Sequence, residues 1–312
     1  MLLFLAVLAP LPLSAGDWSS LYDRSHLEAE KPRLRKALDY VLEHEIEPFL
    51  PEGQRVAFGL QQVDMPLPLA LANPVSIYSK EGTIEFPLAS MLFVEDLARA
   101  YSWLWTNRYS TKTVDEYLAM LRYRSASDFA GHRYPSPLVA LHIPADALSD
   151  KKVVDLAVGT RRTAYAFLLL HEYAHIRLQS ADAKTLKVED SEERADEYAL
   201  NTLENNSAPP TGLLPVMQSW LFLGAGNPAF EHAVTPRRLQ AMAHYLDANV
   251  IEFVRGRPNA LSSTDVIHSI ALVLREEAEL ETVPGHIAAL REFALRTDVE
   301  SLKPRPLPRS TK

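Results

Sequence analysis

The segment Thr163–Leu170 constrains the fold of this 312-residue chain more than any other. It contains no charged residue, glycine or proline, and it leads directly into His171-Glu172-Tyr173-Ala174-His175. A continuous apolar run of this length is typical of a helix buried in a protein core. Imidazole is costly to bury without partners, so the two histidines must find partners inside the protein.

The spacing of the two histidines indicates a metal site. Residues four apart lie on one face of a helix, so the imidazoles of His171 and His175 can bind one ion at about 2.0–2.1 Å. Glu172 lies beside them, in the position of a general base that acts on water rather than of a ligand. Without a metal, the same residues would be two histidines and a glutamate on an ordinary amphipathic helix, satisfied by neighbouring side chains.

An acidic segment further along supplies candidates for a third ligand. Catalytic zinc takes three protein ligands plus water, and the sixteen residues between His175 and Glu192 leave room for a turn and a second, antiparallel helix. Glu192 and Asp196 share one helix face, so one of them can bind the N–H of a ligating imidazole. The remaining acids fit the solvated N-terminus of a helix: Glu189, Asp190 and Glu193.

These two segments resemble the gluzincins, which are HExxH peptidases with a glutamate as the third zinc ligand. The pattern is His-Glu-x-x-His at residues 171–175, followed by Glu-x-x-Ala-Asp-x-x-Ala at residues 192–199. The match covers residues 163–200. The phage-exclusion (Lit-like) peptidases are nearest in layout, because they share a long N-terminal region, a mid-chain motif and a helical tail.

The resemblance implies a function and a set of site residues. His171, His175 and Glu192 would bind one Zn²⁺ ion per chain, Glu172 would be the general base, and Asp196 would bind a ligating histidine from behind. The substrate would be a protein or a peptide. The fold would contain a zincin-like pair of helices around the metal.

A weaker similarity lies at residues 230–240. The segment from His232 to Leu239 is similar to the His-Pro…Arg segment that follows the third ligand in HtpX-like peptidases, although Ala233 stands where the proline normally follows the histidine. This similarity favours His232 as a catalytic residue that donates to the oxyanion of the reaction intermediate. Tyr198 and His244 are other candidates for that donor, and His232 could equally be a loop histidine with no role.

Two other classes of function fit the same residues. A metal-binding regulatory protein would keep the ligands without cleaving a substrate, but it would have no need of the Glu172 carboxylate. A helical interaction module with a fortuitous motif would bind no stoichiometric zinc.

Composition restricts the possible partners and chemistries. The formal net charge is −8 and no basic stretch is interleaved with aromatic residues, so we expect no nucleic-acid partner. The chain has no cysteine, which excludes disulfides, cysteine nucleophiles and thiolate zinc ligands. Oligomeric state and substrate preference are not encoded in a recognisable way.

The N-terminal segment 1–16 is apolar and short, and it ends in prolines and small residues around Ala15. It therefore resembles a signal peptide, although the positively charged start of such peptides is missing. We expect export, periplasmic or secreted, in preference to a cytoplasmic location; a buried N-terminal helix or an anchor is the alternative. The segment is too short and too interrupted by prolines for a typical membrane-spanning helix, and no other stretch approaches 18 uninterrupted apolar residues. We therefore expect no membrane-spanning helix beyond this possible signal or anchor.

The remaining pattern predicts a mainly α protein of the α+β class, with a small β-hairpin. Short strands are expected at 55–63 and 75–86, the second turning at Ser79–Gly82, and the polar segment 44–47 is expected at the surface. Helices are expected at 27–49, 92–105, 114–122, 152–180, 191–204, 212–223, 235–254, 264–280 and 284–296. We divide the chain into a possible signal peptide (1–16), an N-terminal helical region with short strands (17–145), a metallopeptidase domain (146–302) and a disordered tail (303–312).

Overall fold

The computed structural model describes residues 18–50, 57–61, 77–80, 82–181, 188–224, 232–256 and 260–307. The expected signal peptide therefore lies outside the described residues. Within the described parts of the chain, no helix combines the length and the apolar character needed to cross a membrane.

The structure is mainly helical with one small sheet, as the sequence predicts. The strands are β1 (Ala57–Gln61), β2 (Tyr78–Lys80) and β3 (Thr83–Pro87). The helices are α1 (Arg24–Val41), α2 (Leu88–Thr106), α3 (Lys112–Tyr123), α4 (Pro137–Ala140), α5 (Lys151–Ala181), α6 (Val188–Asn205), α7 (Leu213–Ser219), α8 (Pro236–Ala248), α9 (Ala260–Leu280) and α10 (His286–Arg296). Two π-helical turns, Leu42–Ile46 and Trp220–Gly224, extend α1 and α7.

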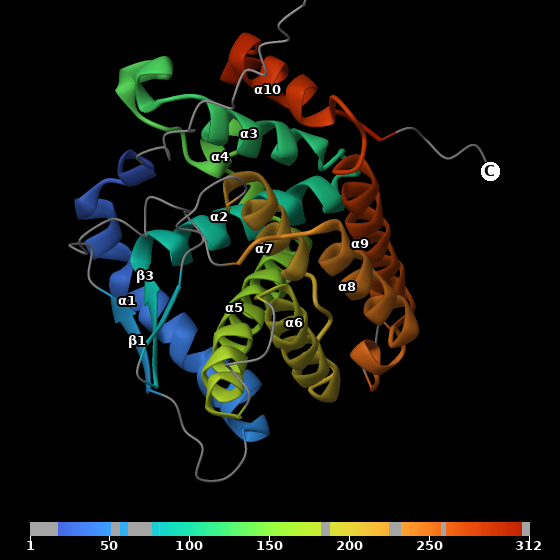
Figure 1. The fold of residues 1–312 in the computed structure, drawn as a ribbon. Helices are drawn as coiled ribbons and strands as arrows, with labels where there is room; N and C mark the ends of the chain where they lie inside the picture. Colours follow the sequence, from blue (N-terminus) through green and yellow to red (C-terminus); the bar gives the residue numbers. More distant parts are fainter. Residues whose placement is uncertain are drawn as a thin grey trace, which may run out of the picture.

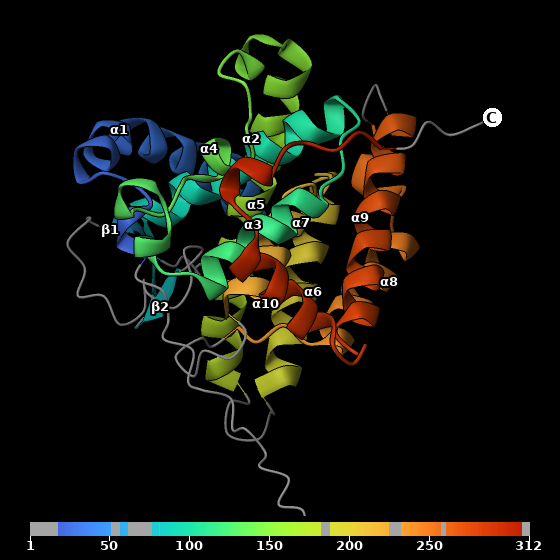
Figure 2. The same ribbon diagram turned by 90° about the horizontal axis from the view of Figure 1, so that it is seen from above.

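Helix α5 is the centre of the fold. It packs against α2 on one side and against α6 on another, while α8 and α9 pack together beside α6 (Figure 1). The apolar run 163–170 is buried throughout, which explains why the sequence there carries no charge. From above, α8 and α9 lie on one side of α5 and α1 lies on the opposite side (Figure 2).

The sheet has the order β1-β3-β2. Strands β2 and β3 form the predicted antiparallel hairpin, with Tyr78 opposite Glu85 and Lys80 opposite Thr83. Strand β1 pairs with β3 in parallel, and this pairing was not predicted, because an isolated strand pattern does not specify its partner. The edge strand β2 also contacts α5, so the sheet lies against the helix that carries the motif.

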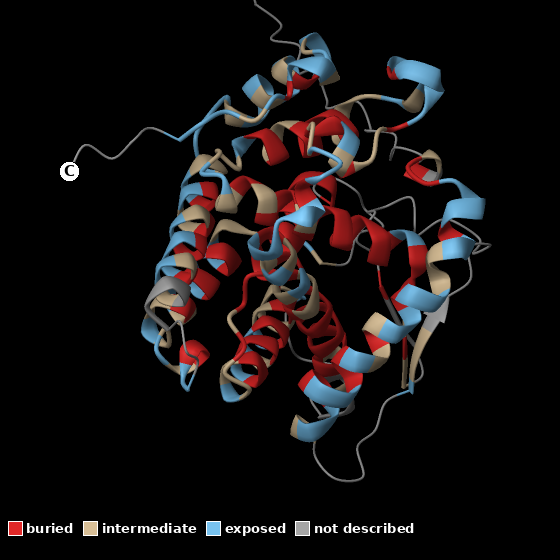
Figure 3. Ribbon diagram, turned by 180° about the vertical axis from the view of Figure 1, so that it is seen from behind, coloured by how far each residue is buried: buried red, intermediate tan, exposed pale blue. Residues whose placement is uncertain are grey.

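The predicted N-terminal region and metallopeptidase domain share one hydrophobic core. The hydroxyl of Tyr165 on α5 donates to the carbonyl oxygen of Met91 on α2 at 2.9 Å, and its ring meets Phe86 edge to face. Buried residues are concentrated on the central helices, whereas the outer helices bury only their inner faces (Figure 3). The two regions are therefore packed as one unit.

The tail predicted to be disordered from residue 303 is partly ordered. Its backbone runs beside residues 108–110: Ser110 N donates to the carbonyl of Arg305 at 2.8 Å, and Leu307 N donates to that of Arg108 at 2.9 Å. Arg305 also pairs with Glu116 at 2.7 Å. Prolines favour an extended tail, and these two backbone hydrogen bonds and the ion pair hold it against the chain. Residues 308–312 lie outside the described residues.

The prediction of a surface position for residues 44–47 is wrong for Glu45 and Ile46, which are 4 % and 0 % exposed. Both residues belong to the π-helical turn that follows α1. Glu45 lies seven residues after Leu38 and four after Val41, which are both buried, so it falls on the inner face of the helix.

Candidate metal centre

Three elements bring four potential ligands together. His171 and His175 lie on α5, Glu192 on α6, and His232 on the extended segment before α8. One ligand atom from each residue lies within 4.8 Å of the others. The pair of helices expected from the sequence is present, because α6 runs back along α5 after a short connection (Figure 1).

The distances between these atoms fit a metal ion. Tetrahedral zinc with bonds of about 2.0–2.1 Å separates its ligand atoms by about 3.3 Å. The Nε2 atoms of His171 and His175 are 3.0 Å apart, and they lie 3.3 and 3.0 Å from the two carboxylate oxygens of Glu192. Nδ1 of His232 is 3.2 Å from both His171 Nε2 and Glu192 Oε2.

Asp196 and Arg238 bind the candidate ligands on the side that faces away from the other ligand atoms. Oδ1 of Asp196 lies 2.9 Å from Nδ1 of His171, which leaves Nε2 of that ring facing the other ligands. Fully buried Arg238 pairs with both oxygens of Asp196 and lies 2.9 Å from Glu192 Oε2. This arrangement of carboxylate, imidazole and ion position is the usual way to orient a metal-binding histidine.

The start of α8 positions Arg238. The hydroxyl of Thr235 caps the helix by accepting from Arg238 N at 3.2 Å. Pro236 occupies the first turn, where its missing N–H costs nothing. The Arg238 guanidinium also donates to the carbonyl oxygens of His232 and Ala233, both at 3.2 Å. The Arg238 side chain therefore holds in place both α6, which carries Glu192, and the segment that carries His232.

Glu172 faces His232 rather than the ligand atoms of its own helix. Its Oε1 lies 2.9 Å from Nε2 of His232. Burial opposes both charges, but Glu172 and Glu192 raise the pKa of His232 to about 10. In turn, His232 and the two motif histidines lower the pKa of Glu172 to about 2, again against the effect of burial. Glu172 is therefore held as a carboxylate.

The charges of the ligands favour a cation between them. Burial disfavours an ionised Glu192, yet hydrogen bonds from the three imidazoles hold its pKa well below the usual range. The pKa of His171 is raised by Asp196 and Glu192 despite its burial. Histidine must be deprotonated to bind a metal, so protons and a metal ion are alternative occupants of this position.

Trp220 and Ser191 contact the centre, and neither was expected there from the sequence. The indole of Trp220 stacks on the His232 ring with 4.9 Å between centroids and an 11° angle, and it also contacts His171 and Arg238. Ser191 Oγ lies 3.4 Å from Nδ1 of His175. Trp220 lies in an apolar run with nothing to separate it from a core residue.

The other candidates lie away from the ligands. The Tyr198 ring packs against Tyr173, and His244 is exposed on α8. The three acids expected at a solvated helix start lie partly exposed at the beginning of α6 and also face the start of α8: Glu189 accepts from Thr235 at 3.0 Å, and Asp190 and Glu193 pair with Arg237 at 3.1 and 2.7 Å. They join α6 to α8 at the rim of the centre.

The chain matches no family model, no curated protein and no solved structure. The geometry of the centre is therefore the basis for any functional conclusion.

Proposed function

We propose that this protein is a zinc-dependent metallopeptidase of the gluzincin type that hydrolyses peptide bonds in a protein or peptide. One observation supports this most strongly: the Nε2 atoms of His171 and His175 and the Glu192 carboxylate converge at ligand distances, and the Glu172 carboxylate lies 2.9 Å from Nε2 of His232, the fourth residue of the cluster. When bound, the ion would polarise a peptide carbonyl and make water a better nucleophile.

The residues of the chain would supply the proton transfers. Glu172 would accept the proton of the attacking water and pass it to the leaving amine. His232 holds this carboxylate through its Nε2, and it is the nearest candidate to donate a hydrogen bond to the oxyanion.

The sheet offers a place for an extended substrate. Strand β2 is an edge strand that contacts α5, and an extended peptide can add to such an edge through its main-chain hydrogen bonds. This position supports a peptide rather than a small-molecule substrate.

The substitution Glu172→Gln tests the proposal. The variant should keep one zinc per chain, because residue 172 is not a ligand, but its turnover of a cleaved peptide should fall at least roughly 100-fold, since the proton acceptor is lost. Glu193→Gln is the matched control: it makes the same change at an acid beside a ligand and should retain activity. Wild-type turnover by Glu172→Gln, with its zinc content confirmed, would overturn the proposal.

A non-catalytic metal-binding protein is the second candidate. Nδ1 of His232 is as close to His171 and Glu192 as a fourth ligand would be, and a site with four protein ligands is typical of structural zinc. If His232 is a fourth ligand, the His232→Ala variant should lose as much zinc as the His175→Ala variant. If His232 is instead an auxiliary catalytic residue, the His232→Ala variant should keep its zinc. Its turnover should fall, because about 3 kcal/mol of transition-state stabilisation is lost.

A further inference from the structure

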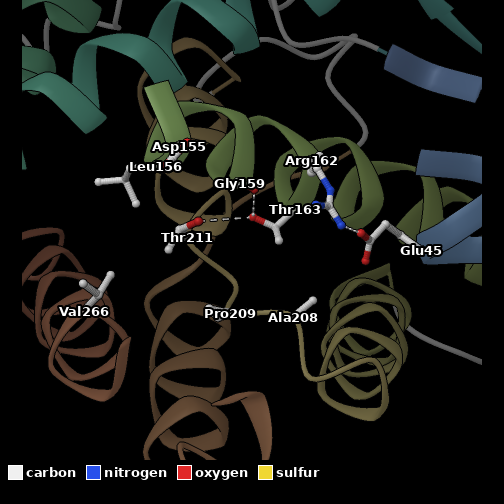
Figure 4. A pocket seen from close by; sticks show the side chains of 10 residues that line it. All are labelled: Glu45, Asp155, Leu156, Gly159, Arg162, Thr163, Ala208, Pro209, Thr211 and Val266. Atoms are coloured by element: carbon white, nitrogen blue, oxygen red, sulfur yellow. Dashed lines mark hydrogen bonds and ion pairs between the residues drawn. The ribbon is translucent and has the colours of Figure 1, made fainter. Parts of the chain in front are cut away.

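Glu277 differs from the other buried acids of the described residues, because it has no cationic partner. It is 6 % exposed. Each of the others lies within ion-pair distance of an arginine or a histidine: Glu45, Glu95, Asp96, Glu172, Glu192 and Asp196. At the cavity along the first turns of α5, for example, Glu45 faces the guanidinium of Arg162 (Figure 4). A buried carboxylate without such a partner is costly.

A second acid lies beside Glu277. Nε2 of Gln218, on α7, donates to Oδ1 of Asp115, on α3, at 2.6 Å and lies 3.4 Å from Oε1 of Glu277, on α9. The two carboxylate oxygens are therefore no further apart than these two distances together. Asp115 is half-buried and also has no ion pair among the described residues. Two carboxylates thus share one neutral amide.

The surrounding charges do not neutralise the two acids. Lys112, which is exposed, is the cation that acts on both of them. Three further acids add negative charge around the pair: Glu116, Glu276 and Glu281. Of these, Glu116 is itself paired with Arg305 at 2.7 Å. Negative charge is therefore in excess where α3, α7 and α9 meet.

Two buried oxygens beside the acids have no hydrogen-bond partner among the described residues. One is Oε1 of Gln218, a residue that is 1 % exposed. The other is the hydroxyl of Tyr101 on α2, whose ring is fully buried. Burial raises the pKa of this phenol, and the charges of Asp115 and Glu277 raise it further, which places both carboxylates near it. Buried polar atoms without a partner call for a ligand.

These groups favour a hard divalent cation. They are all oxygen donors, from two carboxylates, an amide and a phenol, and such donors suit Ca²⁺ or Mg²⁺ rather than zinc. Two carboxylates balance a divalent charge. Mg²⁺ usually keeps several of its waters, whereas Ca²⁺ accepts about six to eight oxygens in a flexible geometry. A buried group of side-chain oxygens therefore fits Ca²⁺ better.

The spacing of the atoms fits one ion. A half turn of the Gln218 amide about its last side-chain bond, a torsion with a broad two-fold preference, exchanges Nε2 for Oε1. Oε1 then takes the present place of Nε2, which is 2.6 and 3.4 Å from the two carboxylate oxygens. Neighbouring oxygens around Ca²⁺, with bonds of about 2.3–2.6 Å, lie roughly 2.7–3.7 Å apart. The observed distances are close to this range.

We propose that Asp115, Gln218 and Glu277 bind one Ca²⁺ ion, with the hydroxyl of Tyr101 as a further oxygen ligand. The half-buried Asp115 gives the ion access from solvent. Without the ion, the two acids hold protons instead, because burial raises the pKa of both, and Ca²⁺ displaces these protons when it binds. The inference goes beyond the proposed peptidase activity, since none of these residues belongs to the candidate metal centre.

Calorimetric titration of the full chain, freed of calcium, with CaCl₂ at pH 8 tests this inference. The wild type should bind about one Ca²⁺ per chain, both with and without one equivalent of zinc. Mg²⁺ should bind roughly tenfold or more weakly. His175→Ala should bind Ca²⁺ as the wild type does, so that failure of the zinc proposal would not be confused with failure of the calcium site.

Isosteric substitutions locate the ion. Asp115→Asn and Glu277→Gln each remove one charged ligand and should weaken Ca²⁺ binding roughly tenfold or more. Tyr101→Phe keeps the ring, loses the hydroxyl and should weaken binding less than either. Glu279→Gln makes the same change at an exposed acid of α9 and should bind as the wild type does.

Three results would each overturn the inference: undetectable Ca²⁺ binding to the wild type, unchanged binding to Asp115→Asn or Glu277→Gln, or an equal loss in Glu279→Gln. Unchanged binding to Tyr101→Phe would overturn the assignment of its hydroxyl as a ligand.

Discussion

Two adjacent glutamates have opposite environments on α6. The side chain of Glu192 is 5 % exposed and faces the histidines, whereas that of Glu193 is 20 % exposed and pairs with Arg237. Consecutive helical residues point about 100° apart, so only one of them can face the metal. Burial thus selects the third ligand of the proposed site.

Alanine substitutions should separate the two glutamates. Glu192→Ala should lower zinc affinity far more than Glu193→Ala, because it removes a ligand atom rather than a rim ion pair. Asp196→Ala should weaken zinc binding by roughly 10–100-fold, as the loss of a carboxylate that orients a ligating histidine usually does. Competition with a chelator of known affinity measures all three. Greater damage from Glu193→Ala would mean that the ligand register is wrong by one residue.

A pair of buried acids creates a pH dependence elsewhere in the core. Gln218 Nε2 donates to Asp115 at 2.6 Å and lies 3.4 Å from Glu277 Oε1. Burial raises the pKa of Glu277 to about 7 and that of Asp115 well above its usual value. The folded protein therefore binds more protons than the unfolded chain, and these acids contribute stability that is lost as the pH rises through about 7.

Glu277→Gln should remove this loss because the amide stays neutral. The variant should gain stability over the wild type as the pH rises from about 5 to 8, by up to about 3 kcal/mol. Urea unfolding across this range measures the gain. Glu279→Gln makes the same change at an exposed acid of the same helix and is the control, which should show a flat difference. A gain that is independent of pH would mean that Glu277 is not protonated in the folded protein.

At the scale of elements, two glycines have opposite roles along α5. A Cβ on Gly212, just before α7, would collide with the backbone of Ala164 and Thr160, so this glycine permits the close approach of α7 to α5. A Cβ on Gly159 would meet nothing within 4 Å. The same residue type thus serves packing at one position and leaves space at the other.

Alanine at these two positions should change stability in opposite directions. Gly212→Ala should destabilise the fold by about 3 kcal/mol, through overpacking against a backbone that cannot move aside. Gly159→Ala should stabilise it by about 1 kcal/mol, through helix propensity. Thermal unfolding of both variants provides the measurement. A stable Gly212→Ala protein would show that α7 can shift away from α5.

At the scale of the whole molecule, the candidate metal centre joins elements from distant parts of the chain. It connects α5, α6 and the segment before α8, and α5 in turn packs into the core shared with α2. An ion that binds only the folded state stabilises all of these elements together.

Chelation should therefore lower the unfolding temperature of the whole protein. With free zinc at about 100 times its dissociation constant, the ion adds about 2.7 kcal/mol to the free energy of unfolding. Calorimetry with and without a chelator should show one transition that shifts as a unit. The unfolding temperature of His175→Ala should not respond to zinc. An equal zinc-induced shift in that variant would place the stabilising ion elsewhere.

Local periodicity allowed much of this protein to be predicted from sequence. The apolar run before His171 required a buried helix, the spacing of His171 and His175 placed both on one face, and the β2–β3 hairpin followed from its turn. These features depend on residues fewer than ten positions apart, and the helical and strand periods already specify such relations. The second helix with Glu192 and Asp196 followed from the same periods.

Only the tertiary structure decided which residues of other segments contact these helices and strands. Nothing local places His232 on Glu172 or Arg238 on Asp196, because each contact joins segments more than 40 residues apart. Trp220 reaches His232 across 12 residues that belong to no single helix or strand, so no local period predicts that contact either. The same holds for the ion pair of Glu45 with Arg162 and for the pairing of residues 305–307 with 108–110. Sequence periods specify which face of a helix is buried, but the partner on that face depends on how the whole chain packs.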